Sequence, residues 1–403
     1  MLEFFSASTR MVNSKRAMEE CMEAAFASQH GREDFDCQLI VIHASLGHNY
    51  QLLLETAQTL APSAQIVGAS CCGIVGREGV SESMKDLAIM AVRGDKNEIC
   101  VAHVDDINGM NSREKSAAMA ESILQQNSAI NMVYFLASGI DIDNDRCIDG
   151  IGSILGEQVT IFGATSSDNM KGVVSYQIAN GKVMKHGAYI VGFADPSLHV
   201  VTKASHGFVA VGEPMTVTRA EGHNIMELDG KPAWSHFTDL LGLNSDATCG
   251  ETIPIGALAE ELPSDALKKE YGSDHILRVV TSHDGETMHY ATTIKEGTKL
   301  WLTTRDEDLI FSEASKMMQW FEEKSGANKP IAVFHADCLA RGRHSFGKIM
   351  KDELVHMMQF PFANAGEIPP WLGMYGFGEF ARLGGKNTYH NYTSALYAIY
   401  RNK

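Results

Sequence analysis

CQLIVIHASLGHNYQLLLETAQTLAPSAQIVGAS, residues 37–70, carries the pattern that decides the fold class. An apolar, strand-like run at residues 37–43 is followed by a helical pattern at 50–60 and by a second apolar run at 64–70. Two apolar strands separated by one helix are typical of a βαβ unit, in which the strands lie parallel in one sheet. The stretch therefore predicts a fold that mixes helices with partly parallel sheets.

The same alternation continues on both sides of this unit. A helix is expected at residues 14–30, and a buried strand is expected at 132–138. The pair Asn180-Gly181 predicts a β-hairpin, and Asp284-Gly285 predicts a second one. The turn cluster around Pro196 ends the first region. We therefore expect an α/β (mixed α+β) protein with two related domains, residues 1–197 and 198–403, each with mixed β-sheets flanked by helices.

Composition limits the possible function. The chain has 403 residues, of which 44% are hydrophobic and 21% charged, as in ordinary globular proteins. A formal net charge of −16 argues against nucleic acid or an anionic membrane as the partner, because both are bound through Lys and Arg. The N-terminus shows no secretory signal, and no window is long and apolar enough to span a membrane. We expect a cytoplasmic protein.

The eight cysteines do not form a recognisable framework. Cys71 and Cys72 are adjacent, but the sequence contains no CxxC pair, so neither a disulfide scaffold nor a zinc ribbon is indicated. The small residues around Cys71 and Cys72 predict a tight turn after a strand, and a redox or soft-metal role is the alternative. Reduced thiols in a reducing compartment are expected.

Reactive side chains gather in two C-terminal segments, VFHADCLARGR (333–343) and MYGFGEFARLGGKNTYHNYTSALYAIY (374–400), each at the edge of an apolar run. If residues 333–336 form a strand, His335 and Asp337 point to one face and Cys338 to the other. The alternative interpretation is that the histidine and the cysteine are core residues. In the second segment, His390 and Asn391 could instead satisfy backbone groups at a turn.

Several blocks in order resemble a FIST protein with its paired N- and C-terminal FIST domains. They are VGASCCGIVGREGV, FGATSSDN, the NGKV hairpin, HGFVAVGEPMTVTRAEGHNIMELDGKPA, HADCLARGR, GFGEF and YHNYTS, which extend from residue 67 to the C-terminal strand. The resemblance implies a FIST N domain at 1–197 and a FIST C ligand-sensing domain at 198–403. It further implies a cytoplasmic sensor, rather than an enzyme, whose output is a partner histidine kinase or cyclic-di-GMP enzyme. A homodimer is compatible with this role.

The matching blocks also imply site residues. The YHNYTS block assigns a ligand-binding role to His390, Asn391 and Thr393, with Tyr375 and Glu379 beside them. Arg341 and Arg343 have planar donors that suit a carboxylate, whether of an amino acid or of a haem propionate. These residues are expected to line one pocket.

Some members of the family are haem proteins that respond to nitric oxide, so haem b is the cofactor implied for this chain. The candidate axial ligands are His335, His390 and Cys338. An amino acid or another small metabolite without haem is the first alternative. A second alternative is an enzyme with Cys338 as the nucleophile and a histidine as the base. A structural adaptor without a ligand pocket is the third.

Overall fold

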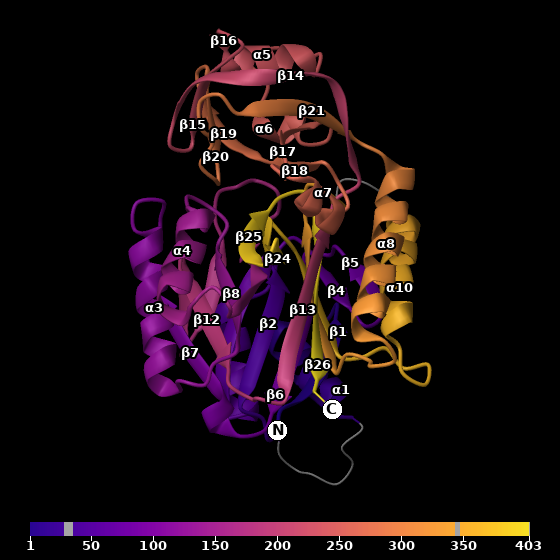
Figure 1. Ribbon diagram of the computed structural model, residues 1–403. Helices are drawn as coiled ribbons and strands as arrows, with labels where there is room; N and C mark the ends of the chain where they lie inside the picture. Colours follow the sequence, from indigo (N-terminus) through magenta and orange to yellow (C-terminus); the bar gives the residue numbers. More distant parts are fainter. Residues whose placement is uncertain (28–34, 343–346, 403) are drawn as a thin grey trace.

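The computed structural model describes residues 1–27, 35–342 and 347–402, which form four β-sheets with helices packed against them (Figure 1). The expected mixed α/β fold is confirmed. The expected βαβ unit is also present, because β2 (Leu39–Ser45) pairs in parallel with β3 (Gln65–Cys71) and α2 (Tyr50–Leu60) connects them. Among the described residues, no helix is both long and apolar enough to cross a membrane.

This parallel unit occurs three times along the chain. The second copy is β8 (Met132–Ser138), α4 (Asn144–Leu155) and β9 (Thr160–Ser166), and the third is β22 (Ala332–Cys338), α10 (Lys348–Gln359) and β23 (Trp371–Gly376). A strand and a helix precede each copy, and an antiparallel strand closes each one. They are β1 (Glu3–Thr9), α1 (Ser14–Ala25) and β6 (Leu87–Arg93); β7 (Ile99–Val104), α3 (Ser112–Gln126) and β12 (Ala188–Phe193); β13 (Leu198–Ser205), α8 (Glu307–Ser325) and β26 (Ser394–Arg401).

A hairpin before the closing strand of each repeat joins the sheet of a neighbouring repeat. The first hairpin pairs with β23, the second with β3 and the third with β9, which closes a cycle. Strands from both halves of the chain therefore share sheets, and the expected boundary at 197/198 falls between β12 and β13. The hairpins are β4 (Ile74–Gly76) with β5 (Gly79–Ser81), β10 (Tyr176–Ala179) with β11 (Lys182–Lys185), and β24 (Gly378–Leu383) with β25 (Lys386–His390).

The hairpin expected at Asn180-Gly181 is present between β10 and β11. Both residues have left-handed backbone, with φ of 46° and 81°, as a two-residue turn between twisted strands requires. The hairpin expected at Asp284-Gly285 is also present, and it joins β19 (Val280–Asp284) to β20 (Thr287–Tyr290).

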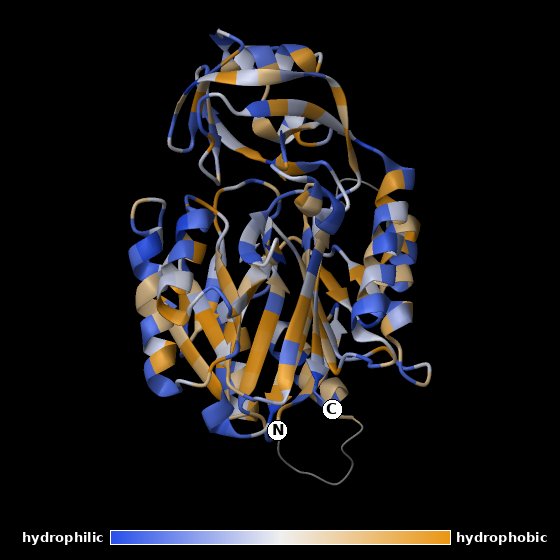
Figure 2. Cartoon of the chain, viewed as in Figure 1, coloured by the Kyte–Doolittle hydropathy of each residue, from blue (hydrophilic) through white to orange (hydrophobic). Residues whose placement is uncertain are grey.

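The inner faces of the three repeat sheets meet in an aromatic and aliphatic core. Phe334 contacts Tyr134 with ring centroids 5.0 Å apart, and Phe162 contacts Tyr397 at 5.5 Å. The outer faces are covered by the helix pairs, whose solvent side is hydrophilic in Figure 2. Burial on both faces explains why these strands are continuous hydrophobic runs in the sequence.

The fourth sheet belongs to an inserted domain, residues 208–305, which lies between β13 and α8 in the sequence and caps one end of the three repeats (Figure 1). We call the three repeats the core domain. The strands of the inserted domain include β14 (Phe208–Glu221), β15 (Asn224–Leu228), β16 (Lys231–Pro232), β17 (Ala257–Glu261), β18 (His275–Arg278) and β21 (Lys299–Arg305), and its helices are α5 (Ala233–Leu240), α6 (Cys249–Thr252) and α7 (Asp265–Tyr271).

Candidate functional site

A cavity of about 840 Å³ lies between the core domain and the inserted domain. The core domain contributes the loop after β8, the residues after β22 and the turn between β23 and β24. The inserted domain contributes the β14–β15 turn, α6 and strands β19 and β20. The side chains that matter below are Asp143, Cys338, Leu339, Ala340, Phe377, His223, Asn224, Cys249, Val280, His289 and Tyr290.

One ion pair connects the two domains beside the cavity. Asp143 is the N-cap of α4, where its Oδ1 accepts a hydrogen bond from the backbone N–H of Arg146 at 2.9 Å. Its Oδ2 accepts a hydrogen bond from Nε2 of His223, in the β14–β15 turn, at 2.7 Å. This hydrogen bond raises the pKa of His223 above its ordinary value, and burial opposes the shift.

A second pair fixes the orientation of an imidazole at the same wall. Nδ1 of His289 lies 2.7 Å from Oδ1 of Asn224. Since an amide oxygen only accepts, Nδ1 of His289 donates to it. The β14–β15 turn thus positions two imidazoles, His223 and His289, at the cavity.

Neutral donors also line the cavity. Cys338, at the end of β22, and Cys249, in α6, line the cavity from opposite domains. Burial raises the pKa of Cys249 to about 11 and that of Cys338 well above its ordinary value, so both thiols are protonated near neutral pH. Tyr290 also lines the cavity, is buried, and lies within electrostatic range of Cys249.

Arg341, expected to bind a ligand carboxylate, is instead completely buried inside the protein. Its Nη1 donates to Oδ2 of Asp337 at 2.9 Å, and its Nε donates to the carbonyl oxygen of His206 at 3.0 Å. His206 lies where the chain leaves the core domain for the inserted domain. Arg341 therefore holds the connection between the domains. Arg343, the other expected donor, lies outside the described residues.

The expected ligand residues of the last hairpin are also enclosed by protein. Glu379 is fully buried and accepts a hydrogen bond from the hydroxyl of Thr393 at 2.7 Å, while Asn391 lies near the carbonyl oxygen of Phe377. Burial raises the pKa of Glu379 well above its usual range. Tyr375 is 2% exposed and packs among the apolar residues under α8 and α10. This group does not line the cavity.

The histidines expected to bind haem iron lie within the core domain. Nε2 of His335 is 2.8 Å from the Ser394 hydroxyl, and the ring lies on the same strand face as Asp337, as β alternation predicts. His390 contacts the Tyr271 hydroxyl through Nδ1 at 3.3 Å and the carbonyl oxygen of Ala381 through Nε2 at 3.4 Å. Burial lowers the pKa of His390 to about 3.

Of the three expected axial ligands, the structure therefore brings only Cys338 to the cavity. Within the described parts of the chain, no group of three or more His, Cys, Asp or Glu side chains is arranged to hold a metal ion.

The cavity residues His223, Asn224, His289 and Tyr290 were not predicted from the sequence. His223 lies in the β14–β15 turn, where Gly222 has a φ of 59°. The local pattern cannot show that this turn reaches across to the N-terminus of α4, a helix some 80 residues earlier in the chain.

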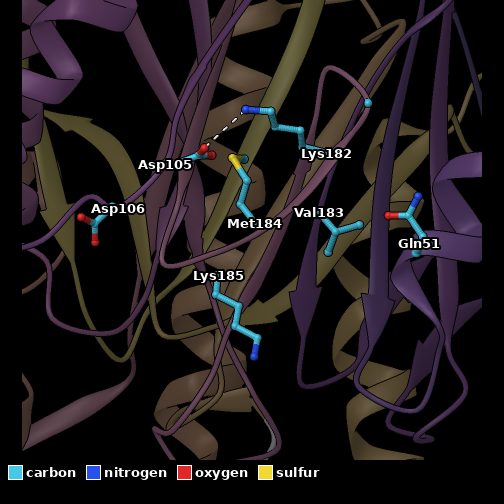
Figure 3. A pocket seen from close by; sticks show the side chains of 8 residues that line it. Gln51, Asp105, Asp106, Lys182, Val183, Met184 and Lys185 are labelled. Carbon is cyan, nitrogen blue, oxygen red and sulfur yellow. Dashed lines mark ion pairs between the residues drawn. The ribbon is translucent and has the colours of Figure 1, made fainter.

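Another concavity, of about 500 Å³, lies beside β11 and is shown in Figure 3. Lys182 reaches Asp105 there at 3.5 Å, whereas Asp106 and Lys185 point away from that pair (Figure 3). The Lys182 and Asp105 side chains are more than half exposed. The charged groups do not converge, so the cavity between the domains is the better candidate site.

Comparison with known proteins gives two family matches. The model of the FIST N domain matches residues 38–231, and that of the FIST C domain matches residues 236–382. An uncharacterised protein of Mycobacterium tuberculosis is 23% identical over 384 residues, which cover 93% of this chain and 94% of that protein. An uncharacterised protein of Mycobacterium bovis is 26% identical over 220 residues, 51% of this chain and 52% of that protein. A crystal structure of cyanuric acid hydrolase from A. caulinodans aligns over the full length of both chains at 7% identity, with a TM-score of 0.39, too low to define a shared fold.

Proposed function

The chain belongs to the FIST family, whose domains are sensors in signal transduction, and from this membership we propose that it senses a small ligand bound in the cavity between its two domains. The observation that carries this proposal is that both domains supply walls of one cavity of about 840 Å³, a size typical of small-molecule sites. A ligand there contacts both bodies at once. The binding free energy of the ligand therefore depends on how the two domains are placed relative to each other.

The contacts between the domains suit this role. Two contacts lie where the chain crosses between the domains. Arg341 donates to the carbonyl of His206, and Nη2 of Arg305 donates to the carbonyl of Ala340 at 3.0 Å. On the cavity side, the His223–Asp143 pair joins them through two side chains. Ligand binding would favour the placement of the inserted domain that completes the cavity. A cytoplasmic partner, a histidine kinase or a cyclic-di-GMP enzyme, would recognise that placement, and a homodimer would present it twice.

The finer version of the proposal has haem b as the ligand and nitric oxide as the signal. His335 and His390 do not fit as axial ligands, because both are buried and bonded to protein groups, His335 inside the core domain and His390 against Tyr271 of the inserted domain. Cys338 reaches the cavity, but burial favours its neutral thiol, whereas iron binds a thiolate. When bound, haem would supply the iron that takes up nitric oxide. A metabolite without haem suits this lining, which combines apolar side chains with a few polar ones, better.

Absorbance spectra after reconstitution test the haem version. The purified full chain is incubated with haemin, freed of excess and scanned, together with C338S and the matched cavity variant C249S. Haem bound through Cys338 predicts a Soret band in the wild type and in C249S that is lost in C338S. Absence of a Soret band from the wild type would eliminate haem and leave the metabolite version.

The enzyme alternative finds less support than the sensor. A cysteine nucleophile requires a lowered pKa and a neighbouring base. Burial moves the pKa of Cys338 in the opposite direction, and the contact described for its thiol is the carbonyl oxygen of Phe377 at 4.0 Å. Slow labelling of Cys338 by a thiol-reactive probe at neutral pH, no faster than that of Cys249, is the expected result.

A further inference from the structure

One buried hydroxyl, on a residue that lines the cavity, has no hydrogen-bond partner among the residues that the structure describes. Tyr290, the last residue of β20, is 5% exposed and lines the cavity. Its hydroxyl makes no hydrogen bond to any residue that the structure describes. Leaving a buried donor unsatisfied lowers stability, so native proteins seldom keep one without a use. A ligand in the cavity would satisfy it.

The position of this hydroxyl is fixed by the inserted domain. The ring packs in the core of that domain with Met288, on the same face of β20, and with Val280 of β19. The backbone N–H of Tyr290 donates to the carbonyl of His223 at 3.0 Å. Burial raises the pKa of Tyr290 well above its ordinary value, so the phenol keeps its proton at every physiological pH. The group is therefore a preorganised donor.

The groups around the Tyr290 hydroxyl limit which kind of ligand group can hydrogen-bond to it. The thiols of Cys249 and Cys338 also line the cavity and are weak donors, and Cys249 is an electrostatic neighbour of Tyr290. Behind the wall formed by residues 338–340, the guanidinium of Arg305 adds a positive charge, held by the carbonyls of Ile253 and Ala340. The hydroxyl and the thiols can each donate to an acceptor, and the nearby cation favours an acceptor over an ammonium group. Leu339 and Phe377 offer apolar surface beside them.

We propose that the Tyr290 hydroxyl is the group that recognises the ligand in the cavity, and that the ligand presents to it a carbonyl-type oxygen, of an amide or a carboxylate, next to an apolar body. This inference rests on the proposed function and deepens it, since it names the polar group that the sensor reads. His223 and Asp143 line the same cavity from opposite domains.

Three compounds with the same ring test this assignment: benzamide, benzoate and benzylamine. Their dissociation constants for the full chain are measured by ligand-observed NMR at fixed pH and salt. The variants are Y290F, the cavity-filling A340W, and Y50F as the matched control. Tyr50 lies in the first repeat, and its hydroxyl donates to the carbonyl of Ala44 at 2.8 Å.

Benzamide or benzoate is expected to bind the wild type at least about tenfold more tightly than benzylamine, and Y290F is expected to weaken that compound about tenfold. The melting temperature of ligand-free Y290F should equal or exceed that of the wild type, because the unsatisfied group is gone, while Y50F should melt lower and bind normally. Tighter binding of benzamide indicates that the ligand presents an amide oxygen, and tighter binding of benzoate indicates a carboxylate oxygen.

Equal binding of benzylamine, unchanged binding to Y290F, or a melting temperature of Y290F as low as that of Y50F would each overturn the assignment of Tyr290. If the compounds bind somewhere other than this cavity, the proposed function fails and the result is different. Binding would then survive in A340W, whose indole fills the cavity. If none of the three compounds binds the wild type at millimolar concentration, both proposals are overturned.

Discussion

Glu379 occupies a position that the second repeat fills with an amide. In the strand register, Glu379 lies opposite Ala164 of β9, and Gln177 lies at the equivalent position opposite Ala69 of β3. Each side chain accepts a hydrogen bond from the residue before the closing strand: the Gln177 carbonyl from the N–H of Gly187, and Glu379 from Thr393, both at 2.7 Å. Glu379 and Gln177 therefore play the same accepting role at equivalent positions.

We predict that E379Q makes the protein more stable at high pH. Burial raises the folded-state pKa of Glu379 well above its usual range, so the folded chain holds this proton more tightly than the unfolded chain. The wild type is therefore most stable, in this respect, below the unfolded pKa of about 4.3, and loses up to about 1.4 kcal/mol per pH unit as pH rises toward the folded pKa. Glutamine removes that loss.

Urea unfolding of both proteins at pH 5 and pH 8 measures the effect. The free energy of unfolding of E379Q relative to the wild type should increase between the two pH values. A variant that is less stable than the wild type at pH 8 would show that the carboxylate is needed in its charged form.

For single residues, the sequence indicated which polar and reactive side chains have a distinct role, but not what they contact. His335 and Asp337 were predicted to share a face, because alternation is a local property of a strand, and they do. Whether Arg341 would face a ligand or the carbonyl of His206 depends on a chain segment 135 residues away, and no local pattern reports that.

At the scale of elements, one glycine recurs at the same place in each repeat. Gly68, Gly163 and Gly373 each pair with the fourth residue of the preceding parallel strand. A Cβ on Gly163 would lie 2.1 Å from the carbonyl oxygen of Phe135, and one on Gly68 would lie 2.7 Å from that of Ile42. The repeated glycine lets neighbouring strands approach closely.

We predict that G163A destabilises the protein by about 2 kcal/mol or more, because alanine is strained at φ of +135° and its methyl group has no room. The matched control is G152A, in the middle of α4, where a Cβ meets no atom within 4 Å. Alanine there should stabilise by about 0.5–1 kcal/mol. Thermal and urea unfolding measure both, and equal stabilities of the two variants would contradict the prediction.

Most elements followed from hydrophobic periodicity and turn chemistry, since both are local. Residues 50–60 were predicted as a helix and form α2, and the Asn180-Gly181 turn formed its hairpin. The threefold repeat was not predicted. The three copies have the same order of strands and helices but no evident sequence similarity. In addition, the inserted domain separates the first strand of the third copy from the rest of it. The pairing of β4 with β23 joins residues about 300 positions apart, which no local pattern encodes.

At the scale of the whole molecule, the His223–Asp143 pair makes the contact between the domains depend on pH. The groups that face His223 are Asp143 and Asp145 at the start of α4, and Arg278 of β18 lies near Asp145. Because the folded pKa of His223 is raised, the stabilisation is complete below its ordinary pKa of about 6.5 and is lost as pH rises through the raised value. It amounts to no more than about 1 kcal/mol, since the imidazole is 30% exposed.

We predict that H223Q abolishes this dependence. Hydrogen exchange of the β14–β15 turn should quicken in the wild type between pH 6 and pH 9, after correction for the intrinsic rate, and should change less in H223Q. The control is H236Q, whose imidazole lies 4.0 Å from Asp229 within the inserted domain and spans no interface. The same corrected change in all three proteins would contradict the prediction.

The cyclic exchange of hairpins also sets a constraint on how the chain can be made. During synthesis, β4 and β5 emerge long before β23, the strand on which they dock, so the first repeat waits with unpaired strand edges until residues 371–376 have left the ribosome. Unpaired edges recruit strands of other chains. A messenger cut short before that point would therefore yield aggregating fragments, and the native molecule would form in one late cooperative step that joins its two ends.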